Sequence, residues 1–117
     1  MDERVIRQHI TFYGWVQGVG FRYRARHAAQ MAGCTGWVRN EYDGTVTMEI
    51  QGTEDQISQV IRAVEKGTYI RIENMRVKTL PTDPEERGFY TRSSYQVRAE
   101  RRRHVRSTFG RYDRSTL

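Results

Sequence analysis

The sequence predicts an α+β fold of the ferredoxin-like, split βαβ kind: a four- or five-stranded antiparallel sheet with two helices on one face. Three observations lead to this prediction. Stretches of alternating apolar residues are separated by two segments of helical periodicity, and the order along the chain is strand, helix, strand, strand, helix, strand. A chain of 117 residues is long enough for one hydrophobic core and too short for two.

The first strand and the first helix follow directly from a change of period. Apolar and polar residues alternate over 10–16, which predicts a half-buried strand. Over 21–32 the apolar residues instead fall on one face of a helix, namely Phe21, Ala25, Ala28, Ala29 and Ala32. Gly33 stands where a helix C-terminus is expected.

A β-hairpin is predicted next. Residues 36–40, GWVRN, predict a strand, and 46–50 predict its partner, with Val46, Met48 and Ile50 on the inward side. Asp43 and Gly44 between them are typical turn residues.

The remaining elements are a second helix and two further strands. Thr53 and Gln56 have the spacing of a capping box, apolar residues follow at helical spacing, and Gly67 ends the helix. Residues 69–80 predict a strand whose alternation breaks phase once, as at a β-bulge. A last strand is predicted over about 89–97.

Positive charge is concentrated at the C-terminus. The net charge is +6, and residues 98–117 contain seven Arg against two acidic residues, so 1–97 carry only +1. We therefore expect a folded domain over 1–97 and an Arg-rich tail over 98–117 that is solvated and without fixed structure. Basic tails can bind nucleic acid, but this one has only two aromatic residues, so nucleic-acid binding is not favoured.

The sequence predicts a cytoplasmic protein that neither spans a membrane nor holds a metal. The opening MDERVIRQHI has no apolar core of a signal peptide, and no stretch approaches the roughly 20 apolar residues that cross a bilayer. Cys34 is the single cysteine, so an internal disulfide is excluded. With no Cys or His at metal-ligand spacing, Cys34 is predicted to be a small buried hydrophobe.

Residues 14–22, GWVQGVGFR, are the main indication of function. Three glycines join the first strand to the first helix, and Arg22 lies where the helix begins. A loop of this kind directs several backbone N–H groups at one point, and a helix N-terminus favours an anion. The guanidinium adds a planar pair of donors that matches two phosphate oxygens, so the segment predicts a phosphate site.

This segment, together with a second one, resembles the acylphosphatase family. The second comprises GWVRN at 36–40, Gly44 and Val46, and Gly52. The likeness covers most of 10–52, and the element order extends it over an acylphosphatase-like domain of about 1–97. Phe12 departs from the pattern, which usually has Leu, Ile or Val there, and the family likeness assigns no role to the Arg-rich tail.

The resemblance implies hydrolysis of the carboxyl–phosphate bond of small acyl phosphates to carboxylate and inorganic phosphate, without metal or cofactor. Arg22 would bind the phosphoryl group together with the backbone N–H groups of Gln17, Gly18, Val19, Gly20 and Phe21. Asn40 would orient the attacking water. Both roles suit phosphoryl transfer, which needs positioning and charge stabilisation more than covalent help. A monomer is expected for a small domain with no obvious apolar patch.

Each of these residues also has a structural interpretation. Arg22 could be a solvated charge in the first turn of a helix, and Asn40 could shape the end of a strand before a turn. The three glycines serve backbone geometry, and Trp37 is predicted to be structural. The acidic pair Glu41 and Asp43 is explained by the hairpin turn.

Histidine chemistry is not indicated. His27 lies five residues after Arg22, about 140° around the helix, so the two side chains cannot share a target. His9 and His104 have no evident carboxylate partner, and all three are predicted to be surface residues.

Two other functions stay open at this point. Related domains occur in larger enzymes that handle carbamoyl phosphate, so this domain could instead bind phosphate or carbamoyl phosphate with little turnover. An RNA-binding module has the same element order, but its stacking aromatics are missing from residues 45–51, TVTMEIQ.

Overall fold

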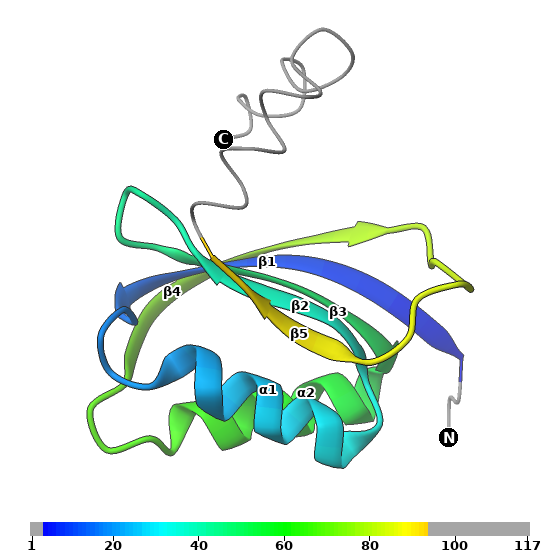
Figure 1. Cartoon of the computed structure of the whole chain (residues 1–117), viewed down its shortest axis with the longest axis horizontal. Helices are drawn as coiled ribbons and strands as arrows, with labels where there is room; N and C mark the ends of the chain where they lie inside the picture. The colour runs from blue at the N-terminus through cyan, green and yellow to red at the C-terminus, as the bar shows by residue number, and fades with distance from the viewer. Residues whose placement is uncertain (1–3, 94–117) are drawn as a thin grey trace, which may run out of the picture.

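The computed structural model describes residues 4–93, which form a five-stranded sheet with two helices packed on one face (Figure 1). The elements are β1 (Val5–Trp15), α1 (Phe21–Ala32), β2 (Thr35–Asn40), β3 (Val46–Thr53), α2 (Glu54–Glu65), β4 (Arg71–Leu80) and β5 (Phe89–Arg92). The strand order is β4-β1-β3-β2-β5. The predicted ferredoxin-like fold class is confirmed.

The sheet differs from the prediction in one pairing. Strands β1, β2, β3 and β4 pair antiparallel, but β5 runs parallel to β2, so the sheet is mixed. The connection 81–88 crosses from β4 at one edge to the opposite edge, at the end of the sheet where β2 begins (Figure 1). A strand that starts there must run in the direction of β2. The rest of the predicted last strand and the Arg-rich tail lie outside the described residues.

The predicted helix boundaries agree with the structure. α1 spans the predicted 21–32 and ends at Gly33, whose φ of 83° is left-handed. The capping box is present, since the Gln56 backbone N–H donates to Thr53 Oγ1 at 3.2 Å and the Thr53 N–H donates to Gln56 Oε1 at 2.8 Å. Within residues 4–93, neither helix is long and apolar enough to cross a membrane.

The predicted bulge lies in β4 opposite Gly14. Tyr13 pairs with Asn74 and Gly14 with Ile72, so the register shifts there and Glu73 is the extra residue. Gly14 has φ 128°, and a Cβ at this position would lie 2.3 Å from the carbonyl oxygen of Arg71. Only glycine permits this close approach of the two backbones.

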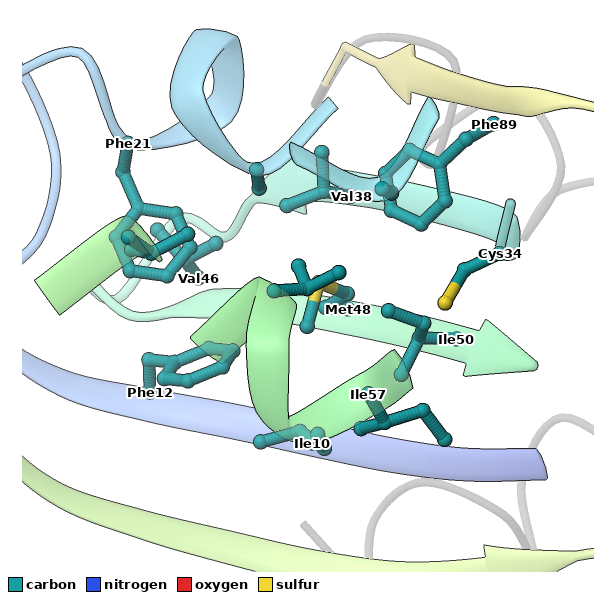
Figure 2. Packing of buried hydrophobic residues seen from close by; sticks show 14 of the residues in the cluster. Ile10, Phe12, Phe21, Cys34, Val38, Val46, Met48, Ile50, Ile57 and Phe89 are labelled. Carbon is teal, nitrogen blue, oxygen red and sulfur yellow. The ribbon is translucent and has the colours of Figure 1, made fainter. Parts of the chain in front are cut away.

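The hydrophobic core fills the space between the sheet and the helices (Figure 2). Phe12 of β1 packs on Phe21, the first residue of α1, with ring centroids 4.8 Å apart. This contact sets the start of α1 over the sheet, so the unusual Phe12 acts in packing. Cys34 is buried and unpaired as predicted, and burial raises the pKa of its thiol to about 11.

A charged network covers the opposite, helix-free face of the sheet. Arg7 donates to Glu86 Oε1 at 2.7 Å and to Glu49 Oε1 at 2.9 Å, and His9 Nδ1 lies 2.7 Å from Glu49 Oε2. Glu86 belongs to the 81–88 connection, so the network attaches that crossing segment to β1 and β3. The prediction that His9 has no carboxylate partner is wrong, because the partner is 40 residues away on a neighbouring strand.

This network predicts a loss of stability in acid. Burial alone would raise the pKa of Glu49, but its contacts with His9 and Arg7 outweigh burial and hold the pKa below its ordinary value. Glu49 therefore stabilises the fold at neutral pH, and this contribution is lost as the pH falls through the lowered pKa. We expect Glu49→Gln to lower the free energy of unfolding at pH 7 by about 2 kcal/mol, measured by urea denaturation.

The difference between Glu49→Gln and the unsubstituted protein should shrink as the pH falls through the lowered pKa of Glu49, because both then carry a neutral group. Glu85→Gln, at an exposed position of the 81–88 connection, is the control and should change stability little. A pH-independent difference would contradict the assigned role of the Glu49 charge.

Candidate functional site

The sheet topology brings the β1–α1 loop and the C-terminal end of β2 to the same end of the sheet. Both strands are antiparallel to β3, which lies between them, so their C-terminal ends point the same way. Two strands separated by one neighbour lie about 10 Å apart. Figure 1 shows the β1–α1 loop and the β2–β3 hairpin at the left end of the molecule.

The loop over 16–20 has the backbone conformation expected of an anion cradle. Gly18 and Gly20 have φ of 75° and 84°, in the left-handed region that favours glycine. Gly20 directly precedes α1, no side chain within residues 4–93 caps this helix start, and its first turn contains no acidic residue. The N–H groups of the first turn are therefore left for an anion, which the helix dipole also favours.

The side chain of Gln17 ties this loop to the hairpin that follows β2. Its Nε2 donates to the carbonyl oxygens of Glu41 at 2.7 Å and Thr45 at 2.8 Å. Both acceptors lie just beyond Asn40, so one carboxamide fixes the loop relative to that residue. Only the backbone of Gln17 was predicted to belong to the site. Its side-chain contacts could not be predicted, because the carbonyl acceptors are 24 and 28 residues away and every residue has such a carbonyl.

Loss of this link should misplace the loop. We expect Gln17→Ala to lower kcat/KM for acetyl phosphate by about 10- to 100-fold, since displacements near 1 Å have effects of this size. The two lost hydrogen bonds should also lower the free energy of unfolding by about 1 to 2 kcal/mol. Gln59→Ala, on the exposed side of α2, is the control for both measurements. Unchanged kcat/KM in Gln17→Ala would show that the loop needs no such link.

Arg22 is the second residue of α1 and is half-buried. Within residues 4–93, its guanidinium has no hydrogen bond, ion pair or ring contact. Arg24 differs, because its guanidinium donates to the carbonyl oxygen of Ala63 at 2.9 Å and joins α1 to α2. Arg22 is thus the arginine at the helix start whose donors are available.

Asn40 is the last residue of β2 and pairs with Val46 of β3. Because side chains alternate along a strand, Asn40 lies on the same face as the buried Val38, which is the face covered by the helices. Arg22 and Asn40 are therefore at the same end of the sheet and on the face that the helices cover.

The acidic residues of the hairpin have structural partners. Glu41 Oε2 accepts from Arg39 Nε at 2.8 Å, so its charge is compensated. Asp43 Oδ1 accepts from the backbone N–H of Thr45 at 3.0 Å and from its hydroxyl at 2.7 Å, which closes the turn. Their predicted role in the turn is confirmed.

The described residues provide no histidine or metal site at this end of the sheet. His27 is exposed and stacks on Tyr23, with ring centroids 6.1 Å apart, while His104 lies outside the described residues. Within residues 4–93, no group of three or more His, Cys, Asp or Glu side chains could hold a metal ion. Trp37, predicted to be structural, is buried, and the guanidinium groups of Arg39 and Arg92 lie 4.6 and 4.5 Å from its ring centroid.

A hollow of about 310 Å³ lies beside the β1–α1 loop, on the side where β4 lies. It is lined by residues of β1, β4 and the segment before β4, namely Trp15, Thr68, Tyr69, Ile70 and Arg71. None of the predicted site residues lines it. The sequence did not indicate this hollow, although Trp15, on the outward side of the first predicted strand, could have suggested it.

The family is shown by comparison with known proteins. The family model described as acylphosphatase matches residues 8–91, which is most of the chain. This protein belongs to the acylphosphatase family. Acylphosphatase from Geobacillus thermodenitrificans is 40% identical over 84 residues, covering 71% of this chain and 89% of that one. Acylphosphatase from Oceanobacillus iheyensis is 46% identical over 78 residues, covering 65% and 86%.

Solved structures of acylphosphatases have the same fold. The crystal structure of acylphosphatase from Bacillus subtilis aligns with a TM-score of 0.68 and 28% identity, over 74% of this chain and 98% of that one. Full-length HypF in its phosphate- and nucleotide-bound form aligns with a TM-score of 0.69 and 26% identity, over 80% of this chain but only 12% of that protein. The domain therefore occurs both alone and as a small part of a larger chain.

Proposed function

We propose that this acylphosphatase-family protein hydrolyses acyl phosphates at the end of the sheet where the β1–α1 loop and the end of β2 meet. The observation that supports the proposal is the Gln17 link, which ties the glycine-rich loop before Arg22 to the carbonyl oxygens of Glu41 and Thr45, just after Asn40 in the chain. The phosphoryl group would lie on the backbone N–H groups of 17–21 and on the Arg22 guanidinium. These donors stabilise the charge on the equatorial oxygens as the P–O bond breaks.

Asn40 would hold the attacking water. Its carboxamide offers one acceptor and two donors in a plane, which suits a water fixed in line with the bond to be broken. The water oxygen bonds to phosphorus, and the P–O bond to the acyl group breaks with its electron pair on the carboxylate. The products are a carboxylate and dihydrogen phosphate. Because a carboxylate leaves readily, no general acid is needed.

The test is release of inorganic phosphate from acetyl phosphate and benzoyl phosphate by the full-length protein. Inorganic phosphate should inhibit competitively, since it occupies the same cradle. If phosphate is released no faster than in buffer alone, and inorganic phosphate does not bind to the loop, the proposal is refuted.

A second candidate is a domain that binds phosphate or carbamoyl phosphate with little turnover. The observation in its favour is the similarity to a small part of HypF, whose structure was determined with phosphate and nucleotide bound. The affinity for phosphate, measured by calorimetry, should be set beside kcat for acetyl phosphate. Tight binding with negligible hydrolysis would favour this candidate over the enzyme.

The expected partners are small acyl phosphates and inorganic phosphate. Nucleic acid is not favoured, because β3 (Val46–Thr53) contains no aromatic residue for base stacking. A monomer in the cytoplasm stays our prediction from the sequence.

A further inference from the structure

The hollow beside the loop is lined mainly by large, exposed side chains. Trp15 and Tyr69 are 68% and 76% exposed, which is unusual for aromatic residues of this size, whereas Ile70 is 8% exposed. Arg71 is also exposed, and within residues 4–93 its guanidinium has no hydrogen bond or ion pair. The hollow thus combines apolar surface with an uncompensated positive charge.

The backbone defines the position of these side chains. The bulge opposite Gly14 makes Trp15 and Arg71 direct cross-strand neighbours, and the side chains of such a pair lie side by side. The Ile70 N–H donates to the carbonyl oxygen of Gly67 at 3.2 Å, so the segment before β4 is a closed turn that presents Tyr69.

The hollow lies next to the loop that would hold the phosphoryl group. Trp15 is two residues before Gln17, so their Cα atoms are at most about 7.6 Å apart. In the strand order, β4 lies on one side of β1 and β2 on the other, so the loop after β1 separates the hollow from Asn40. In an in-line displacement the leaving oxygen is opposite the attacking water. With the water at Asn40, the acyl oxygen would point away from β2, toward the side of the loop on which β4 and the hollow lie.

We propose, on the basis of the hydrolytic activity proposed above, that this hollow binds the acyl group and selects aromatic acyl phosphates that carry a second carboxylate. Trp15 and Tyr69 provide flat apolar surfaces for a ring. The Arg71 guanidinium pairs with a carboxylate at the far end of that ring. The volume of about 310 Å³ is at the lower end of small-molecule pockets, as suits a single ring.

The experiment compares three substrates: acetyl phosphate, benzoyl phosphate and 4-carboxybenzoyl phosphate. Arg71→Gln should lower kcat/KM for 4-carboxybenzoyl phosphate by about 10-fold, as expected for one charge-assisted contact, and leave the other two substrates unchanged. Trp15→Ala should lower kcat/KM for both aromatic substrates by about 10-fold and leave acetyl phosphate unchanged. Both residues are exposed, so thermal unfolding should confirm that the variants fold.

The matched control is Lys78→Gln, which removes the same charge from the same strand. Lys78 pairs with His9, seven residues farther along β4 and about 24 Å from Arg71. If it lowers kcat/KM for 4-carboxybenzoyl phosphate as much as Arg71→Gln does, the effect is long-range attraction and the inference is wrong. Equal effects of Arg71→Gln on all three substrates would also overturn it.

Inhibition of the unsubstituted protein gives an independent measurement. Terephthalate should compete with acetyl phosphate better than benzoate, and benzoate better than acetate; equal inhibition by the three would contradict the inference. Failure of the proposed hydrolytic activity can be told apart from failure of this inference, because in the first case none of the three substrates is hydrolysed in an Arg22-dependent way.

Discussion

Replacing Arg22 by Ala should lower kcat/KM for acetyl phosphate by about 10³- to 10⁴-fold, the range found when an arginine that stabilises a transferring phosphoryl group is removed. Arg22 is the second residue of α1, directly after the glycine-rich loop, and within residues 4–93 nothing else occupies its donors. Its loss removes both charge and directed hydrogen bonds from the phosphoryl oxygens. The affinity for inorganic phosphate should fall as well, because the ground state uses the same contacts.

Arg22→Lys should recover little of this activity. An ammonium is a point charge and cannot supply the planar pair of donors. Arg26→Ala is the matched control, since this residue is also half-buried on α1, one turn farther on. Its guanidinium lies 5.9 Å from the Tyr23 ring centroid, and kcat/KM should stay within about twofold in this variant. Equal losses at Arg22 and Arg26 would indicate that general positive charge, and not a specific phosphate contact, supports the reaction.

Replacing Asn40 by Ala should lower kcat by about 10²- to 10³-fold with little change in KM, as expected when one positioned polar group is removed from the transition state. The reason is that Asn40 would orient the water and make no contact with the phosphoryl group in the ground state. Steady-state kinetics with acetyl phosphate and the affinity for inorganic phosphate separate the two effects. The affinity for phosphate should be unchanged.

Asn74→Ala serves as the control for Asn40→Ala, because it removes the other asparagine of the chain from the exposed strand β4. It should leave kcat unchanged. If Arg22→Ala and Asn40→Ala instead weaken phosphate binding and turnover alike, the division of work between them is wrong. If both leave slow turnover unaltered while phosphate still binds, the binding-domain alternative gains support.

The local parts of the fold were predictable because short stretches of chain encode them. The span of α1, its end at Gly33 and the Thr53–Gln56 capping box depend on neighbours a few residues apart. The turn at Asp43 likewise uses a hydrogen bond to Thr45, two residues on. The bulge in β4 was visible as a break in the alternation of apolar residues.

Contacts between distant segments were not predictable in the same way. The sequence contains Gln17, but its acceptors are backbone carbonyls, and every residue has one. His9 shows no local carboxylate, yet β1–β3 pairing places Glu49 opposite it. The parallel course of β5 follows from the path of the 81–88 connection, which residue patterns do not specify.

The sequence by itself determined the order of elements, the ends of both helices and the candidate residues of the phosphate cradle, because periodicity, caps and motifs are properties of neighbouring residues. Only the tertiary structure placed the loop after β1 and Asn40 at one end of the sheet and brought Trp15 together with Tyr69 and Arg71 around the hollow. Strand pairing and register decide these relations, and both depend on contacts between residues far apart in the chain.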